Sequence, residues 1–92
     1  MLESHYAPHA TVELAESEEA AEGRRAHHAG AGRRVDVLSP RTTVAEYAHH
    51  LYDWLRAADE RHLDVLVVVP PPAVGVGVAV NERLAKASGR RE

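Results

Sequence analysis

The stretch LDVLVVV, residues 63–69, decides the fold class of this chain of 92 residues. Apart from Asp64 it is a continuous run of apolar, largely β-branched residues, and it is too short for a typical helix. Such a run is typical of a central strand in a parallel sheet whose two faces are both covered. Pro70, Pro71 and Pro72 follow and end the strand, because proline cannot donate a hydrogen bond to a neighbouring strand.

The segments before this strand alternate between two kinds of periodicity. Alternating apolar residues predict short strands at residues 11–16 and 34–38. Between them, a helix is expected over residues 17–29. Ser17 is its predicted N-cap, acidic residues occupy its first turn, and Gly30 is its predicted stop.

The most regular helical pattern covers residues 43–60. Its apolar residues recur at steps of three and four, and Thr43 and Glu46 have the spacing of a capping box. A last helix is expected after the glycine-rich turn at residues 75–77, ending at Gly89. The predicted order is therefore strand, helix, strand, helix, strand, helix.

This alternation predicts an α/β fold, a small Rossmann-like unit of three layers with a short parallel sheet, right-handed crossovers and three helices. The first ten residues lack any sustained period, and Pro8 excludes a helix interior there. We therefore expect an extended, linker-like N-terminal arm over residues 1–10 and one Rossmann-like domain over residues 11–92.

Composition narrows the class of protein further. The chain has no cysteine, which excludes disulfide scaffolds, thiolate zinc sites and cysteine nucleophiles. No apolar run approaches the ~20 residues of a membrane span, and the first residues do not resemble a signal peptide. The net charge of −3 argues against a domain that coats nucleic acid. We expect a small cytoplasmic domain without membrane contact.

Gly75 and Gly77 are candidate phosphate-binding residues, because they follow a strand and precede a helix. The third glycine of a dinucleotide fingerprint would fall at position 80, which is Val80. Glycines also serve simply to turn the chain after three prolines. Both interpretations of the turn remain open.

No group of side chains points to a metal centre. The histidine pairs at residues 27–28 and 49–50 point in different directions on a helix, and Pro8 separates His5 from His9. A zinc site would need four suitably spaced ligands, and none are found. We therefore expect no metal site in this chain.

Neither catalysis nor RNA binding has a recognisable motif. There is no nucleophile elbow and no P-loop, so no catalytic residue is assigned. The three arginine doublets are not interleaved with aromatic residues that could stack on bases, and tRNA contact by this domain alone is not expected. The carboxylates considered for acid–base chemistry are more simply solubilising charges, with Asp53, Asp59 and Glu60 on a helix and Asp64 at the start of the central strand.

Three segments together resemble the C-terminal accessory domain of threonylcarbamoyl-AMP synthase. MLESHYAP, residues 1–8, is similar to the second half of that family's interdomain linker. LYDWLRAAD, residues 51–59, resembles an L-Y-x-x-L-R-x-x-D pattern. Residues 71–84 resemble the ending P-P-x-x-G-L-G-x-A-x-x-N-R-L, with Val76 and Glu82 as departures.

The resemblance implies a role beside a YrdC-like catalytic domain, supplied in cis or in trans. That enzyme makes threonylcarbamoyl-adenylate from threonine, bicarbonate and ATP for the t6A modification of tRNA. ATP is then a substrate of the parent enzyme, and this chain needs no cofactor of its own. Because the family's linker lies over the catalytic cleft, His5 and Tyr6 are expected to contact ligand and Pro8 to stiffen the arm.

The chain also departs from the family. It has no counterpart of the catalytic domain, so it is not expected to be catalytic alone. Met1 falls at the linker methionine, which suggests a truncated gene, an internal start or a split enzyme. Only residues 39–42 separate the second strand from the long helix, where many relatives carry more sequence.

Three further interpretations remain open. The chain could be a small nucleotide-binding module, a protein-interaction α/β module or a gene fragment without independent function. Homodimerisation is also expected if an apolar patch that a partner normally covers is left exposed.

Overall fold

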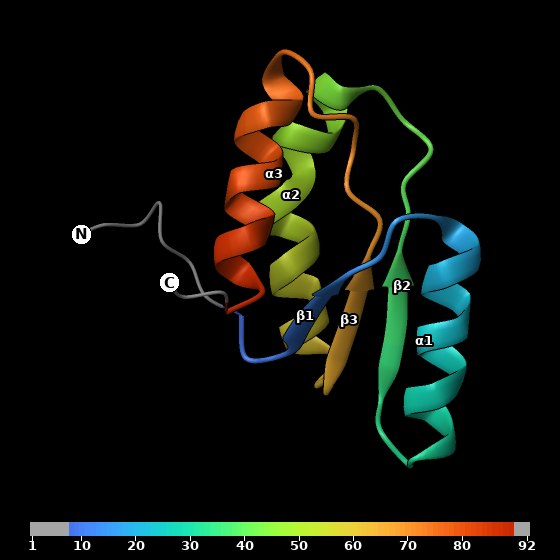
Figure 1. The fold of residues 1–92 in the computed structure, drawn as a ribbon. Helices are drawn as coiled ribbons and strands as arrows, with labels where there is room; N and C mark the ends of the chain where they lie inside the picture. The colour runs from blue at the N-terminus through green and yellow to red at the C-terminus, as the bar shows by residue number, and fades with distance from the viewer. Residues whose placement is uncertain (1–7, 90–92) are drawn as a thin grey trace.

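A computed structural model describes residues 8–89 of the chain, and Figure 1 shows that strands and helices alternate along it. The predicted order of elements is confirmed. The six elements are β1 (Thr11–Leu14), α1 (Glu18–Gly30), β2 (Val35–Leu38), α2 (Val44–Glu60), β3 (Val65–Val68) and α3 (Val76–Ala87).

The three strands form one parallel sheet with the order β1-β3-β2. In the register of the sheet, Val65 lies opposite both Thr11 and Val35. Helix α1 covers one face of the sheet, and α2 and α3 cover the other (Figure 1). The described residues therefore have the predicted α/β architecture of three layers.

Strand β3 consists only of apolar residues because both of its faces are buried. Leu66 and Val68 belong to the core beneath α2 and α3, whereas Val65 and Val67 belong to the core beneath α1. All four side chains are buried. Because successive residues of a strand point to opposite faces, only a strand covered on both sides buries every one of them.

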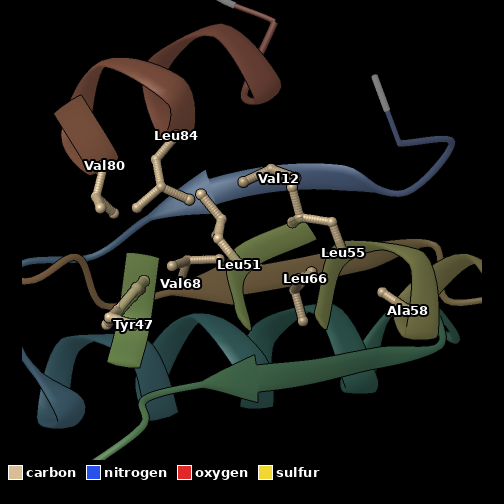
Figure 2. Packing of buried hydrophobic residues seen from close by; sticks show 9 residues of the cluster. All are labelled: Val12, Tyr47, Leu51, Leu55, Ala58, Leu66, Val68, Val80 and Leu84. Atoms are coloured by element: carbon tan, nitrogen blue, oxygen red, sulfur yellow. The ribbon is translucent and has the colours of Figure 1, made fainter. Parts of the chain in front are cut away.

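The two cores differ in size. Nine buried residues fill the space between the sheet and the pair α2–α3 (Figure 2), and they are Val12, Tyr47, Leu51, Leu55, Ala58, Leu66, Val68, Val80 and Leu84. The α1 side is built from smaller side chains, and Ala21 is the one residue of α1 that is buried. Most of the apolar packing therefore lies around α2.

Both predicted N-caps are confirmed. The hydroxyl oxygen of Ser17 accepts a hydrogen bond from the backbone N–H of Ala20 at 3.1 Å. The hydroxyl oxygen of Thr43 does the same for Glu46, also at 3.1 Å. These bonds satisfy N–H groups that have no partner within the helix.

The helix ends differ in part from expectation. Gly30 was predicted to stop α1, but it lies within the helix, and Gly32 adopts the left-handed conformation that closes it, with φ +85°. The N–H of Arg33 then donates to the carbonyl of His28, which completes a Schellman motif. Helix α2 ends in the same way, with His62 at φ +58° in the left-handed position.

The other boundaries shift by a few residues. Each strand is four residues long, shorter than the apolar patterns suggested. Helix α3 begins at Val76, so Gly77 lies in its first turn rather than in the preceding loop. Gly89, at φ +80°, follows the end of α3 as predicted.

Candidate functional site

A carboxylate of α2 binds the backbone of residues 9–10 at the junction between the N-terminal residues and the domain. Asp59 Oδ1 accepts hydrogen bonds from the backbone N–H groups of His9, at 3.0 Å, and Ala10, at 3.2 Å. Oδ2 lies 3.2 Å from the same N–H of His9. Pro8 is half-buried immediately before this contact, whereas His5 and Tyr6 lie outside the described residues.

The amphipathic pattern of α2 explains why Asp59 can reach the junction. Leu55 and Ala58 are buried against the sheet. Asp59 is half-buried at the border of this face, in the last turn of the helix. Ala10 is itself buried, and β1 begins at the next residue. The junction therefore lies where α2 ends and the sheet begins.

Hydrogen bonds of Arg34 stabilise the connection between α2 and β3, close to the same junction. The side chain of Arg34 donates to the carbonyl oxygens of His62, at 3.1 Å, and Arg61, at 2.8 Å. Asp64 accepts from the backbone N–H of Arg34 at 2.8 Å, and its carbonyl accepts from Thr11 at 2.9 Å. These bonds fix the end of the sheet at which β1 begins.

The two glycines of the predicted phosphate turn are each required by a different feature of the backbone. Gly75, the N-cap of α3, has φ 58° and ψ −129°, a backbone conformation that residues other than glycine rarely adopt. A Cβ on Gly77 would lie 1.9 Å from the carbonyl oxygen of Pro72, so this glycine lets two backbones approach closely. Phosphate binding by these residues stays a prediction.

The other features of this turn are a tie between backbone segments and a group of exposed apolar side chains. Asn81 donates from Nδ2 to the carbonyls of Pro71, at 2.9 Å, and Gly77, at 2.8 Å, which ties α3 to the proline segment. The most exposed large apolar side chains among the described residues are Val74, Val76 and Val78. The start of α3 thus presents valine side chains to its surroundings.

A second polar cluster lies beside strand β1, and sequence reasoning did not predict it. Glu13 contacts His28 Nε2 at 3.0 Å and Arg24 Nη1 at 3.3 Å, joining β1 to α1. Partial burial raises the pKa of Glu13, but the hydrogen bonds and charges of His28 and Arg24 outweigh it and hold the pKa below its usual value. The four-residue spacing of Arg24 and His28 on one helix face was the only available signal.

A shallow hollow of about 300 Å³ adjoins this cluster, lined in part by Glu13 and Arg24 together with Val12, Leu14 and Ser88. It lies along the outer edge of β1, at the end of α3. Its lining combines one ion pair with apolar side chains.

The remaining polar residues show no convergent chemistry within residues 8–89. No three His, Asp or Glu side chains there are grouped so that they could hold a metal ion. Asp53, predicted to be a solubilising charge on a helix face, is exposed and pairs with Arg56. The described arginines of the doublets have partners within the domain, as Arg25 pairs with Glu22 and Arg33 contacts His28.

These features define a class of protein, a small parallel α/β domain whose residues 8–10 are anchored at one end of its sheet. The family follows from comparison with known proteins. A family model described as the C-terminal domain of threonylcarbamoyl-AMP synthase matches residues 1–89. The chain therefore belongs to this family of C-terminal domains.

Individual relatives agree. The threonylcarbamoyl-AMP synthase of Bacillus subtilis (strain 168) is 33% identical over 109 residues, which cover 99% of this chain and 32% of that protein. Because the chain has only 92 residues, some of the relative's residues have no counterpart here. The chain spans about a third of the length of this relative.

Solved structures share the fold. The crystal structure of P. abyssi Sua5 complexed with L-threonine is 31% identical, with a TM-score of 0.81 over 92% of this chain and 30% of that one. A variant of the same protein, in which an adjacent histidine and tyrosine are replaced by alanine, gives a TM-score of 0.78 at 28% identity, over 89% of this chain and 28% of that one. None of the helices described here is long and apolar enough to cross a membrane.

Proposed function

We propose that this domain assists a YrdC-like catalytic domain that makes threonylcarbamoyl-AMP from threonine, bicarbonate and ATP in the cytoplasm. The adenylate then serves the t6A modification of tRNA. The observation that carries the proposal is the family match over residues 1–89, which includes the arm as well as the globular part.

The proposed role of the arm is to help close the catalytic cleft. His5 and Tyr6 form the one His-Tyr dipeptide of this sequence. An adjacent histidine and tyrosine are the residues replaced in the P. abyssi Sua5 variant, and P. abyssi Sua5 has also been solved in complex with L-threonine. We therefore assign His5 and Tyr6 to ligand contact and Pro8 to stiffening the arm.

In this proposal the chemistry belongs to the catalytic domain. The globular part of this chain docks beside that domain, in cis or in trans, and delivers the arm to the cleft. ATP enters as a substrate of the assembled enzyme, and the accessory domain supplies no cofactor. The closed arm excludes water, which would otherwise hydrolyse the reactive intermediates.

The proposal is tested by measuring threonylcarbamoyl-AMP by mass spectrometry. A catalytic domain from the same genome is made separately and assayed with and without this chain. We expect product from the mixture well above the level of the catalytic domain alone, and none from this chain alone. Product formed by this chain alone would contradict the assignment of the chemistry to the partner.

Matched variants separate the arm from the globular part. His5→Ala and Tyr6→Ala are expected to reduce the stimulation at least fivefold. His49→Ala, which removes an exposed histidine from α2, should leave the stimulation unchanged. Equal loss from His5→Ala and His49→Ala would contradict the assigned role of the arm.

A further inference from the structure

The side chain of Asp59 binds the backbone at the point where the arm joins the domain. Asp59 receives the N–H groups of two consecutive residues, His9 and Ala10, with three donor–acceptor distances between 3.0 and 3.2 Å. One hydrogen bond would leave the chain free to rotate about it. Two adjacent peptide groups held by one carboxylate have a fixed orientation.

The position of Asp59 in its helix is unfavourable for the helix itself. It lies in the last turn of α2, next to Glu60, and that turn has no basic residue. The C-terminal end of a helix carries partial negative charge, so carboxylates there are destabilising. The hydrogen bonds that Asp59 accepts from His9 and Ala10 offset this cost.

The residues on both sides of the contact also restrict the backbone. Ala10 is buried, and the N–H of Thr11 donates to the carbonyl of Asp64 at 2.9 Å. On the other side, the ring of Pro8 restricts its backbone to φ near −65°. The arm thus leaves from a fixed peptide through a stiff residue.

We infer that Asp59 is a positioning residue for the reaction that this family serves. It fixes the orientation of the peptide groups at His9 and Ala10, which the arm needs if His5 and Tyr6 are to act at the cleft once the globular part has docked. This inference rests on the proposed function. It adds a residue 50 positions away from His9 in sequence, on a different element, to the working parts of the arm.

The activity test compares three variants in the mixed assay. Asp59→Ala should lower the maximal stimulation at least fivefold while the domain concentration for half-maximal stimulation stays within twofold, because docking is preserved. Asp59→Asn keeps an acceptor oxygen and should retain more than half of the stimulation. Thr43→Ala removes the cap at the other end of α2, about 24 Å away, and controls for lost helix stability.

Combining variants tests whether Asp59 acts through the arm. The double variant Asp59→Ala with Tyr6→Ala should be no worse than Tyr6→Ala alone, since both changes disable the same arm. The inference is overturned if Asp59→Ala loses no more stimulation than Thr43→Ala, if Asp59→Asn is as impaired as Asp59→Ala, or if the two losses add.

A measurement without enzyme activity keeps this inference separate from the proposed function. The chain has no cysteine, so His9→Cys gives a unique site for a nitroxide spin label on an exposed residue. Asp59→Ala should shift the electron paramagnetic resonance spectrum to the fast-motion component, and Thr43→Ala should not. If the wild-type chain fails to stimulate, the proposed function fails, and the spin label still decides whether Asp59 holds the junction. An unchanged spectrum in Asp59→Ala overturns the inference.

Discussion

The α-carbon of Gly77 faces the carbonyl oxygen of Pro72 so closely that an added Cβ would lie 1.9 Å from that oxygen. The contact brings the first turn of α3 against the proline segment that ends β3. It gives Gly77 a packing role that is independent of any ligand.

Gly77→Ala is therefore expected to be severely destabilising. The backbone of either segment has to move, and we expect a loss of about 3 kcal/mol in the free energy of unfolding. Urea unfolding followed by circular dichroism measures this loss. Gly23→Ala in α1 is the matched control, because nothing lies within 4 Å of its added Cβ, and a gain of about 0.5–1 kcal/mol is expected. Similar effects of the two substitutions would contradict the close contact.

His62 is expected to be a site where glycine improves stability. It holds φ 58° at the end of α2, where a side chain is strained and glycine is not. His62→Gly should raise the free energy of unfolding by about 1 kcal/mol, seen as a rise of several degrees in the melting temperature. Gly32→Ala, at the equivalent position after α1, should lower it by a similar amount. A lower melting temperature for His62→Gly would show that its side chain has stabilising contacts.

Tyr47 is expected to make the domain sensitive to alkali. Its hydroxyl donates to the carbonyl of Val69 at 2.9 Å, and burial raises the pKa of the phenol well above its usual value. The neutral form is thus favoured in the folded state. Its contribution is present below pH ~10 and declines above it, because the unfolded chain releases the proton first.

Comparison of wild type with Tyr47→Phe isolates this effect. Because it lacks the hydrogen bond to Val69, the variant should have a free energy of unfolding about 1 kcal/mol lower than that of the wild type near neutral pH. It should then lose less stability than the wild type between pH 10 and 11.5 in urea titrations. Parallel pH profiles for the two proteins would contradict the buried, neutral phenol.

Glu13 is expected to make the stability of the domain sensitive to acid. Its pKa is held below the usual value by His28 and Arg24, which outweigh the effect of partial burial. The ionised carboxylate therefore stabilises the folded state above pH ~4.5, and this contribution is lost as the pH falls through the lowered pKa. Glu13→Gln should cost about 1 kcal/mol at pH 7 and little at pH 3.

The control for this effect is Glu22→Gln in α1, whose carboxylate is fully exposed beside Arg25. We expect little change in stability at pH 7 for this variant. A loss from Glu22→Gln as large as that from Glu13→Gln would mean that general surface charge, rather than the cluster on β1, is being measured.

The sequence allowed the fold class to be predicted because its strongest signals are local. The apolar run that contains β3 and the capping box at Thr43 each report on a few neighbouring residues. The central position of β3 followed from its lack of polar residues. The Schellman closure at His62 was missed, since histidine is not a usual residue for that conformation.

The candidate site was less predictable, because its contacts join residues far apart in the chain. Asp59 appeared as one carboxylate among several on a helix face, and only the structure places it against His9 and Ala10. The cluster of Glu13 with Arg24 and His28 likewise depends on how α1 lies across the sheet. The sequence specifies such contacts only through the complete fold.

The central claim is that the arm of this domain acts on a catalytic domain supplied by the synthase. The most direct test compares residues 1–92 with residues 8–92 as activators of that catalytic domain, measuring threonylcarbamoyl-AMP by mass spectrometry. Both proteins retain every described strand and helix, and equal melting temperatures would verify this. We expect residues 1–92 to stimulate product formation and residues 8–92 to leave it at the level of the catalytic domain alone. Equal stimulation by both would contradict the account.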